Sequence, residues 1–450
     1  MPEQFPPELT DLLPDYLAAQ RWYAGTSSVS ADDLHVTLAR RLWNGGTGHE
    51  LWHLVVEAAG EHYQLVLGMR PAGEPADFLH GHESSVLGAA SGVFAYDAAW
   101  DSDMSKTLLE VVSEGRETAT FARPMAAEQS NTSIVFDDRL ILKLFRRLRP
   151  GRNPEIEVAT ALAEAGFANV AAPLLEWRDG GYDLAFGQEF LAGGTEGWAM
   201  ALTSLRDFYG SPETDRPEDA GGDFGAEAER LGLVTAEMHL ALHRVFGAAA
   251  SEMVGAEWSK LIEGLGPRLA RAGQHLDRDL LDAAGPLLDR LRKVTDPGPA
   301  SRVHGDFHLG QVMRTDLGWF VLDFEGEPAK SVEERTAPAS VLKDVAGMLR
   351  SFHYASRLAL MERAVPEWAE MVSSAHAWEA HNRQAFLEGY RRHEEVSTLL
   401  PDPSVTVAVL SAYELDKCLY ELEYELSHRP EWVAIPLDGL ERLVLGGDVD

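Results

Sequence analysis

The sequence VHGDFHLGQ at residues 303–311, followed by VLDFE at residues 321–325, decides the interpretation of this chain. Asp306 and Gln311 are five residues apart, and Asp323 follows after a short turn. One carboxylate of such a set can accept a proton from a hydroxyl group. The amide oxygen and the second carboxylate can then hold Mg²⁺ against a nucleoside triphosphate. The pattern therefore predicts phosphoryl transfer.

The spacing also matches the catalytic loop of kinases, in which Asp is followed five residues later by Asn and then by an Asp-Phe metal site. Two positions depart from that pattern. Gln311 replaces the Asn, and Glu325 stands where protein kinases have Gly. The departure at Glu325 and the polar stretch at 130–133, which stands in place of a glycine-rich loop, argue against a protein kinase and favour a kinase that acts on small molecules.

Composition limits the classes of protein. A chain of 450 residues is too long for one small core, which predicts two or three subdomains. The 39 basic and 72 acidic residues give a net charge of −33, which disfavours binding to nucleic acid or to anionic membranes. The phosphates of a bound nucleotide must therefore be neutralised by a few local cations and a metal ion.

Several features indicate a soluble cytoplasmic protein. Cys418 is the only cysteine, which excludes an intrachain disulfide. The N-terminal residues are acidic and contain proline, unlike a signal peptide. We find no uncharged apolar run of about 18 residues, so a membrane-spanning helix is not expected.

Residues 1–90 are expected to form a small separate unit. Strand-like runs at 34–38, 51–58 and 63–67 with glycine-rich turns predict an antiparallel sheet. The small apolar residues 84–96 favour a helix, and residues 108–112 read as a strand.

A polar stretch precedes the apolar strand predicted at 140–145. Ser130, Asn131, Thr132 and Ser133 can form a plain hairpin turn, or can offer N–H and hydroxyl donors to phosphates. Lys143 lies within the strand, either at a sheet edge or where a kinase places its phosphate-pairing lysine.

A helix is expected from Pro154 to residue 165, with Asn153 as its N-cap. Within it, Glu157 is the first choice for the acidic partner of Lys143, and Glu155 is the second. Alternatively, both are first-turn charges that favour the helix.

A strand at 184–190 runs into Gly193-Gly194, which fits a hinge between two lobes. Backbone groups of Gln188, Glu189 and Leu191 are then candidates for contact with an adenine edge. From residue 197 onward, the pattern changes to helices.

The predicted helix at 411–427 has an unusually polar face. Positions 413, 417, 420 and 424 share one side, and this side combines Tyr and Lys residues. Such a face suits sugar binding, although a solvated helix held by ion pairs explains it equally well.

Four stretches, at 20–25, 128–143, 304–328 and 414–436, resemble the maltokinases of actinobacterial type. These belong to the aminoglycoside-phosphotransferase-like group of kinases. The resemblance implies an α+β, bilobal, protein-kinase-like fold. It further implies a cap at 1–90, a strand-rich nucleotide-binding subdomain at 91–194 and a helical C-lobe at 195–450.

The resemblance implies that ATP and Mg²⁺ are used to convert maltose to maltose 1-phosphate, which feeds glycogen-type α-glucan synthesis from trehalose. Enzymes of that route are then possible partners. By position, the resemblance makes Asp306 the catalytic base, Gln311 and Asp323 the Mg²⁺ ligands, and Lys143 a phosphate contact held by Glu157. The resemblance also gives His304 and Arg350 a role in supporting the loop. The residues it suggests for binding the acceptor are His308, Glu414, Lys417, Tyr420 and Tyr424.

Two other functions remain open. A glucosamine or aminoglycoside kinase would use the same catalytic residues, and the net charge does not exclude a cationic acceptor. A catalytically silent nucleotide-binding regulator is disfavoured, because such a protein has no need of Asp306, Gln311, Asp323 and Lys143 together.

Overall fold

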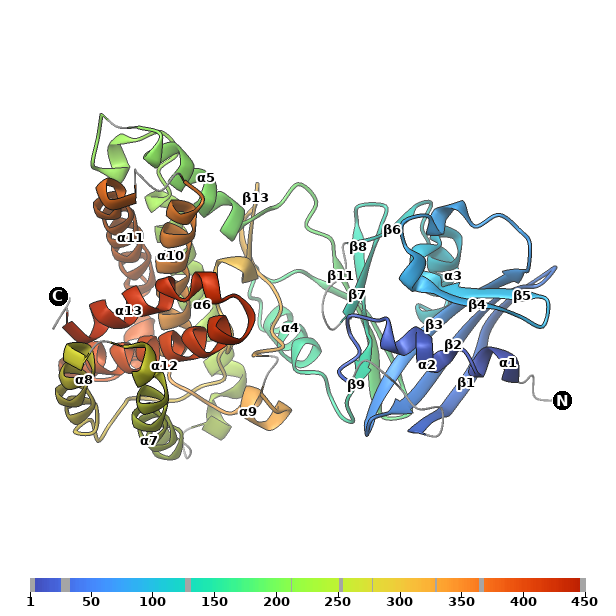
Figure 1. Cartoon of the computed structure of the whole chain (residues 1–450), viewed down its shortest axis with the longest axis horizontal. Coiled ribbons are helices and arrows are strands. Elements are labelled where there is room, and N and C mark those ends of the chain that lie inside the picture. The colour runs from blue at the N-terminus through green and yellow to red at the C-terminus, as the bar shows by residue number, and fades with distance from the viewer. Residues whose placement is uncertain are drawn as a thin grey trace. The chain divides into compact units, whose positions relative to one another are not determined.

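The computed structural model describes residues 5–25, 33–125, 131–211, 213–250, 254–276, 278–327, 330–363 and 368–445. The chain forms two compact units (Figure 1). Unit 1 contains residues 1–157 and 171–192, and unit 2 contains residues 158–170 and 193–450. The chain enters the second part of unit 2 between Ala192 and Gly193, beside the glycine pair at which a hinge was predicted.

The first sheet of unit 1 is antiparallel, in the order β1-β2-β3-β5-β4, with the short β9 paired to β3. Two short helices, α1 (Pro7–Thr10) and α2 (Leu13–Ala18), pack their leucines into an apolar cluster on one face. The strands are β1 (Leu34–Gly46), β2 (His49–Ala58), β3 (Glu61–Pro71), β4 (Val86–Ala90), β5 (Val93–Asp97) and β9 (Arg147–Leu148).

A second antiparallel sheet of unit 1 has the order β10-β11-β8-β7-β6. A core joins it to the first sheet, and this core contains Val66 of β3, Leu108 of α3 (Ser102–Val112) and Leu142 of β8. The strands are β6 (Ala122–Pro124), β7 (Asn131–Phe136), β8 (Leu140–Phe145), β10 (Pro173–Asp179) and β11 (Tyr182–Glu189).

Three sequence-based expectations for unit 1 differ from the structure. Residues 84–96 form β4 and β5 rather than a helix, with a turn at Gly92, whose φ of 78° suits glycine. Residues 108–112 lie in α3, because Asp101 accepts hydrogen bonds from the first-turn N–H groups and the helix buries one apolar face. The first sheet also continues to Asp97, beyond the expected cap limit at residue 90.

Unit 2 is mainly helical. Its central helix, α10 (Leu342–Met361), is buried along most of its length and contacts α5, α11, α12 and α13. The division from unit 1 falls inside α4 (Pro154–Glu164). The other helices are α5 (Gly197–Tyr209), α6 (Gly225–Ala250), α7 (Val254–Ala272), α8 (Arg278–Leu291), α9 (Val332–Thr336), α11 (Trp368–Arg391), α12 (Pro403–His428) and α13 (Ala434–Leu445).

A small antiparallel sheet in unit 2 consists of β12 (Thr195–Glu196), β13 (Val312–Thr315) and β14 (Gly318–Val321). The hairpin of β13 and β14 joins the 303–311 and 321–325 segments, so the two halves of the predicted site are held together by strand pairing. Within the described part of the chain, no helix is both long enough and apolar enough to cross a bilayer.

Candidate active site

The segment that carries Asp306 is anchored to α10 by one carboxylate. Asp344, near the start of α10, accepts hydrogen bonds from the backbone N–H groups of His304 at 2.7 Å and Gly305 at 2.9 Å. The ring of His304 also bonds the carbonyl of Leu322 at 2.8 Å, which connects the two halves of the site. His304 therefore supports the loop, as predicted.

The carboxylate of Asp344 is itself held in place by two further side chains. His239 of α6 lies 3.1 Å from its carboxylate, and the hydroxyl of Tyr390 on α11 lies 2.8 Å from the other nitrogen of His239. Burial raises the pKa of Asp344, but the hydrogen bond and charge of His239 outweigh this and lower it. We did not predict this chain of contacts. Its only sequence signal is the single acid near the start of α10, which directly follows Lys343.

Two glycines allow the loop to follow this path. Gly305 has a φ of 89°, a conformation that other residues rarely adopt. On α10, a Cβ at Gly347 would lie 2.5 Å from the carbonyl oxygen of Phe307, so only glycine permits this close approach.

Asp306 is ion-paired to Lys417 of α12 at 3.0 Å, and the Asp306 side chain is 19% exposed. Burial would raise the pKa of this carboxyl group, but the charge of Lys417, followed by that of His308, lowers it to about 2. Asp306 is therefore ionised at neutral pH. A carboxylate in this state can accept a hydrogen bond from a substrate hydroxyl.

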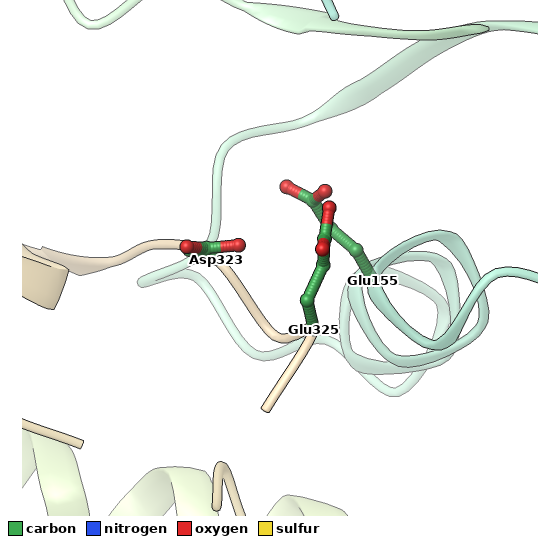
Figure 2. Close-up of side chains that lie close together, drawn as sticks. All are labelled: Glu155, Asp323 and Glu325. Atoms are coloured by element: carbon green, nitrogen blue, oxygen red, sulfur yellow. The ribbon is translucent and has the colours of Figure 1, made fainter. Parts of the chain in front are cut away.

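Gln311 and Asp323 meet in the structure. The side-chain amide of Gln311 donates to Asp323 at 3.3 Å, and the backbone N–H of Leu322 donates to the carbonyl of Gln311 at 2.9 Å. Asp323 has a φ of 59°, a strained conformation of the kind found at functional sites. Figure 2 shows Asp323 and Glu325 projecting from the segment that follows β14.

The donor set fits Mg²⁺. A carboxylate and an amide oxygen are the hard ligands that this ion prefers. The hydrogen bond from the Gln311 nitrogen leaves the amide oxygen available as a ligand. These two residues of unit 2 would hold the ion.

A cavity of about 380 Å³ adjoins Asp306. It lies among α7, α10, α12 and the loop, and its volume is within the range of about 300–1,000 Å³ typical of ligand pockets. Lys417 and Tyr420 line it, and the ammonium group of Lys417 lies 5.1 Å from the Tyr420 ring centroid. The structure thus brings these two predicted acceptor residues together with Asp306.

Other residues predicted to contact the acceptor are placed differently. Glu414 is buried and forms two hydrogen bonds with Arg383 of α11, at 2.6 and 3.1 Å, so its carboxylate ties two helices together. Glu414 does not line the cavity beside Asp306, so the structure does not bring it together with the other predicted acceptor residues. Tyr424 is 37% exposed and stacks on His428, with the ring centroids 4.4 Å apart.

His308 and Arg350 also have defined partners. A ring nitrogen of His308 accepts from the backbone N–H of Gly310, and the other lies 4.0 Å from Asp306. Arg350 is buried and pairs with Glu421 of α12 at 2.6 Å. Arg350, predicted to support the loop geometry, therefore holds the helix that carries Lys417.

In unit 1, Lys143 of β8 forms an ion pair with Glu155 at 2.8 Å. Glu155 is buried, whereas Glu157 is exposed. The acidic partner of Lys143 is therefore Glu155, the second choice from the sequence, and the first choice of Glu157 is wrong. The N-cap Asn153 accepts from the N–H of Glu155 at 2.8 Å, as predicted for the start of α4. The capped first turn thereby positions Glu155 for Lys143.

The predicted phosphate-contacting stretch is partly a strand. Asn131, Thr132 and Ser133 belong to β7 and pair with β8, so their backbone groups are used in the sheet. The prediction of a turn is wrong for these three residues, because the whole segment Asn131–Phe136 pairs with β8 and is mostly buried, which favours a strand. Ser130 lies outside the described residues.

The predicted adenine-contacting residues lie at the end of unit 1. Gln188 and Glu189 are the last residues of β11, where they pair with Ile141 and Leu140 of β8. Leu191 follows, two residues before the chain enters unit 2.

The architecture and these side chains define a protein-kinase-like phosphotransferase. Its strand-rich unit carries Lys143 and Glu155, and the helical unit that follows carries Asp306, Gln311 and Asp323. Residues 122–396 match the phosphotransferase enzyme family, and the chain belongs to this family. Residues 16–101 match the maltokinase N-terminal cap domain. The resemblance to maltokinases and to aminoglycoside-phosphotransferase-like proteins is therefore confirmed.

Similar proteins agree with this assignment. A glucosamine kinase of Streptacidiphilus jiangxiensis is 27% identical over 72% of this chain and 73% of its own length. A glucosamine kinase of Mycolicibacterium smegmatis is 25% identical over 74% of this chain and 82% of its own.

A solved structure of glucosamine kinase in complex with glucosamine, ADP and inorganic phosphate is similar in fold. Its TM-score is 0.64 at 22% identity, and the match covers 99% of this chain and 100% of the other. The α+β kinase-like fold, with an N-terminal antiparallel sheet and a helical C-terminal region, is confirmed.

Proposed function

We propose that this protein transfers the γ-phosphoryl group of ATP to a hydroxyl group of a small sugar, and that maltose is its acceptor. The observation that carries the proposal is the position of Asp306, which lines a cavity of about 380 Å³ together with Lys417 and Tyr420. The cavity has room for a sugar, and Asp306 is ionised and ready to accept a proton. The match to the maltokinase cap domain supports maltose as the acceptor.

In this proposal, Asp306 accepts the proton of the attacking hydroxyl, which for maltose is the anomeric one. The hydroxyl must approach to within about 3 Å of the carboxylate. Lys417 keeps Asp306 ionised and oriented through the 3.0 Å ion pair. The ring of Tyr420 offers an apolar face against which a sugar ring can pack. The product is maltose 1-phosphate.

The nucleotide is bound by other residues. Gln311 and Asp323 would hold Mg²⁺, which when bound neutralises phosphate charge. Lys143, oriented by Glu155 at 2.8 Å, is the proposed phosphate contact of unit 1. Gln188, Glu189 and Leu191 remain the proposed adenine contacts.

The physiological role follows from the acceptor. Maltose 1-phosphate is an activated maltosyl donor, so the proposed product would feed α-glucan synthesis from trehalose through a maltosyltransferase in the cytoplasm. Enzymes of that route are the partners we propose.

A second candidate is the phosphorylation of glucosamine. The relatives from two organisms that bear this name favour it, and they align with about three quarters of this chain. The fold and the catalytic loop suit both acceptors, so the choice between them depends on the acceptor cavity.

The test is to measure ADP production with ATP, Mg²⁺ and each of maltose, glucosamine, glucose and kanamycin. Maltose is expected to give the highest kcat/KM, with phosphate transferred to the anomeric oxygen. Turnover of glucosamine without turnover of maltose would overturn the acceptor assignment. Absence of turnover with every sugar would overturn the kinase proposal.

A further inference from the structure

The charges around the acceptor cavity differ from those of the rest of the protein. The chain as a whole has a net charge of −33. The cavity walls, however, carry more basic than acidic side chains. The basic ones are Arg268, Arg271, Lys330, Lys343 and Lys417, and the acidic ones are Asp306, Glu327, Asp416 and Glu423.

Most of these basic groups are neutralised by a carboxylate of the same cavity. The pairs are Arg268 with Asp416, Arg271 with Glu423 at 3.0 Å, Lys330 with Glu327 at 2.6 Å, and Lys417 with Asp306 at 3.0 Å. Lys343 is different. Among the residues that the structure describes, no hydrogen-bond or ion-pair partner of its ammonium group is found.

The fold fixes the position of Lys343. It precedes Asp344, whose carboxylate holds the backbone of His304 and Gly305. A Cβ at Gly305 would lie 3.9 Å from the Nζ of Lys343, so the ammonium group lies beside the residue that precedes Asp306. Lys343 is thus next to the place where an acceptor hydroxyl must meet the base.

The surroundings of Lys343 leave its charge poorly compensated. Burial lowers the pKa of Lys343, the neighbouring charge of Lys330 lowers it further, and the charges of Asp344, Glu327 and Asp416 offset this only in part. A partly buried cation without a partner destabilises the folded protein unless a ligand satisfies it. Clustering with Asp306 in one cavity makes a functional role the better explanation.

We propose that Lys343 determines acceptor specificity, because its ammonium group donates hydrogen bonds to the oxygens of a neutral, polyhydroxylated sugar and repels an acceptor that carries an ammonium group. The inference rests on the proposed function, since it assumes that the acceptor enters this cavity. It goes further in assigning the preference for a neutral sugar over an amino sugar to one side chain.

The experiment compares glucose with glucosamine, because these sugars differ only in having a hydroxyl or an ammonium group at C2, and includes maltose. Lys343→Met removes the charge and keeps an unbranched side chain that is one atom shorter. We expect KM for the neutral sugars to rise and kcat/KM for glucosamine to rise. The ratio of neutral to amino sugar efficiency should fall by about tenfold or more.

Two further variants serve as controls. Lys343→Arg keeps the charge and should retain most of the wild-type ratio. Lys260→Met makes the same change on an exposed part of α7, where the lysine side chain is 65% exposed, and should leave the ratio unchanged. Circular dichroism of each variant shows whether it is folded.

The inference is overturned if folded Lys343→Met keeps the wild-type ratio, or if Lys260→Met changes it equally. This outcome is distinct from failure of the proposed function. If the wild-type protein prefers glucosamine, maltose is refuted as the acceptor. The role of Lys343 is still tested, by comparing the ratio of neutral to amino sugar efficiency in the variant with that in the wild type. If no sugar is phosphorylated, calorimetric titration with glucose and glucosamine measures the same ratio as affinities, and binding of neither sugar overturns both proposals.

Discussion

At the scale of single residues, the ionisation of Asp306 depends on the balance of two opposing effects. Burial favours the neutral acid, whereas Lys417 at 3.0 Å favours the carboxylate and prevails, giving a pKa of about 2. The residue identified from its spacing in the sequence is therefore found in the charge state that a base requires. Its neighbour Lys417 sets that state.

Replacement of Asp306 by Asn should remove the proton acceptor and leave the shape of the cavity unchanged. We expect kcat to fall by at least about a hundredfold, as is typical for loss of a general base. ATP binding, measured by calorimetry, should change little, because the proposed nucleotide contacts are elsewhere. A near-normal rate in this variant would show that Asp306 is not the base.

Replacement of Lys417 by Met should change the pH profile. The carboxylate is active when ionised, so activity is present above its pKa and is lost as the pH falls through it. Without Lys417, burial raises the pKa of Asp306, and the acid limb of kcat/KM should move up by about one pH unit or more. Lys417→Arg keeps the charge and should keep the limb near its wild-type position. An unshifted limb in Lys417→Met would contradict the role of the ion pair.

At the scale of elements, α10 is the scaffold of the site. Asp344 holds the loop, Lys343 lines the cavity, and Gly347 allows the loop to lie against the helix. The helix itself is predictable from its apolar periodicity. The bond from Asp344 to the loop is not, because it joins residues 40 positions apart in the chain.

A methyl group at Gly347 should disturb the loop. Since a Cβ there would lie 2.5 Å from the carbonyl oxygen of Phe307, Gly347→Ala should move the loop and lower kcat by about tenfold or more. The melting temperature should fall as well.

The matched control is Gly264→Ala on α7, where a Cβ would have nothing within 4 Å. Alanine favours helix over glycine by about 1 kcal/mol, so this variant should be as stable as wild type or more so, with normal activity. Equal behaviour of the two variants would contradict the close approach at Gly347.

At the scale of the whole molecule, unit 1 combines its two antiparallel sheets in one folded body. Arg146, which directly follows β8, is buried and pairs with Asp97 of the first sheet at 2.6 Å. It also donates to Thr132 of β7 at 2.9 Å. Together with the shared apolar core, this contact argues that the two sheets of unit 1 unfold as one.

Replacement of Arg146 by Met should test this coupling, because it leaves the Asp97 carboxylate buried without its cation. The expected loss in free energy of unfolding is about 3–5 kcal/mol, measured by urea denaturation. Arg147→Met is the neighbouring control. Its partner Glu61 is partly exposed, so the loss should stay below about 1 kcal/mol. Equal losses would show that burial of the Arg146 pair does not matter.

The sequence by itself determined the parts of this protein that depend on local pattern. The strand that carries Lys143, the capped start of α4, the helices of unit 2 and the spacing of Asp306, Gln311 and Asp323 all follow from neighbours within a few residues. Local pattern failed at residues 84–96 and 108–112, where packing between the sheets and the Asp101 cap decided the outcome.

Only the tertiary structure decided which distant side chains meet. It chose Glu155 over Glu157 for Lys143, placed Glu414 against Arg383, and brought Lys417 to Asp306 and Lys343 to the cavity wall. Each of these contacts depends on the direction in which a helix presents its faces to another element. That direction is set by the packing of the whole core, which no short stretch of sequence contains.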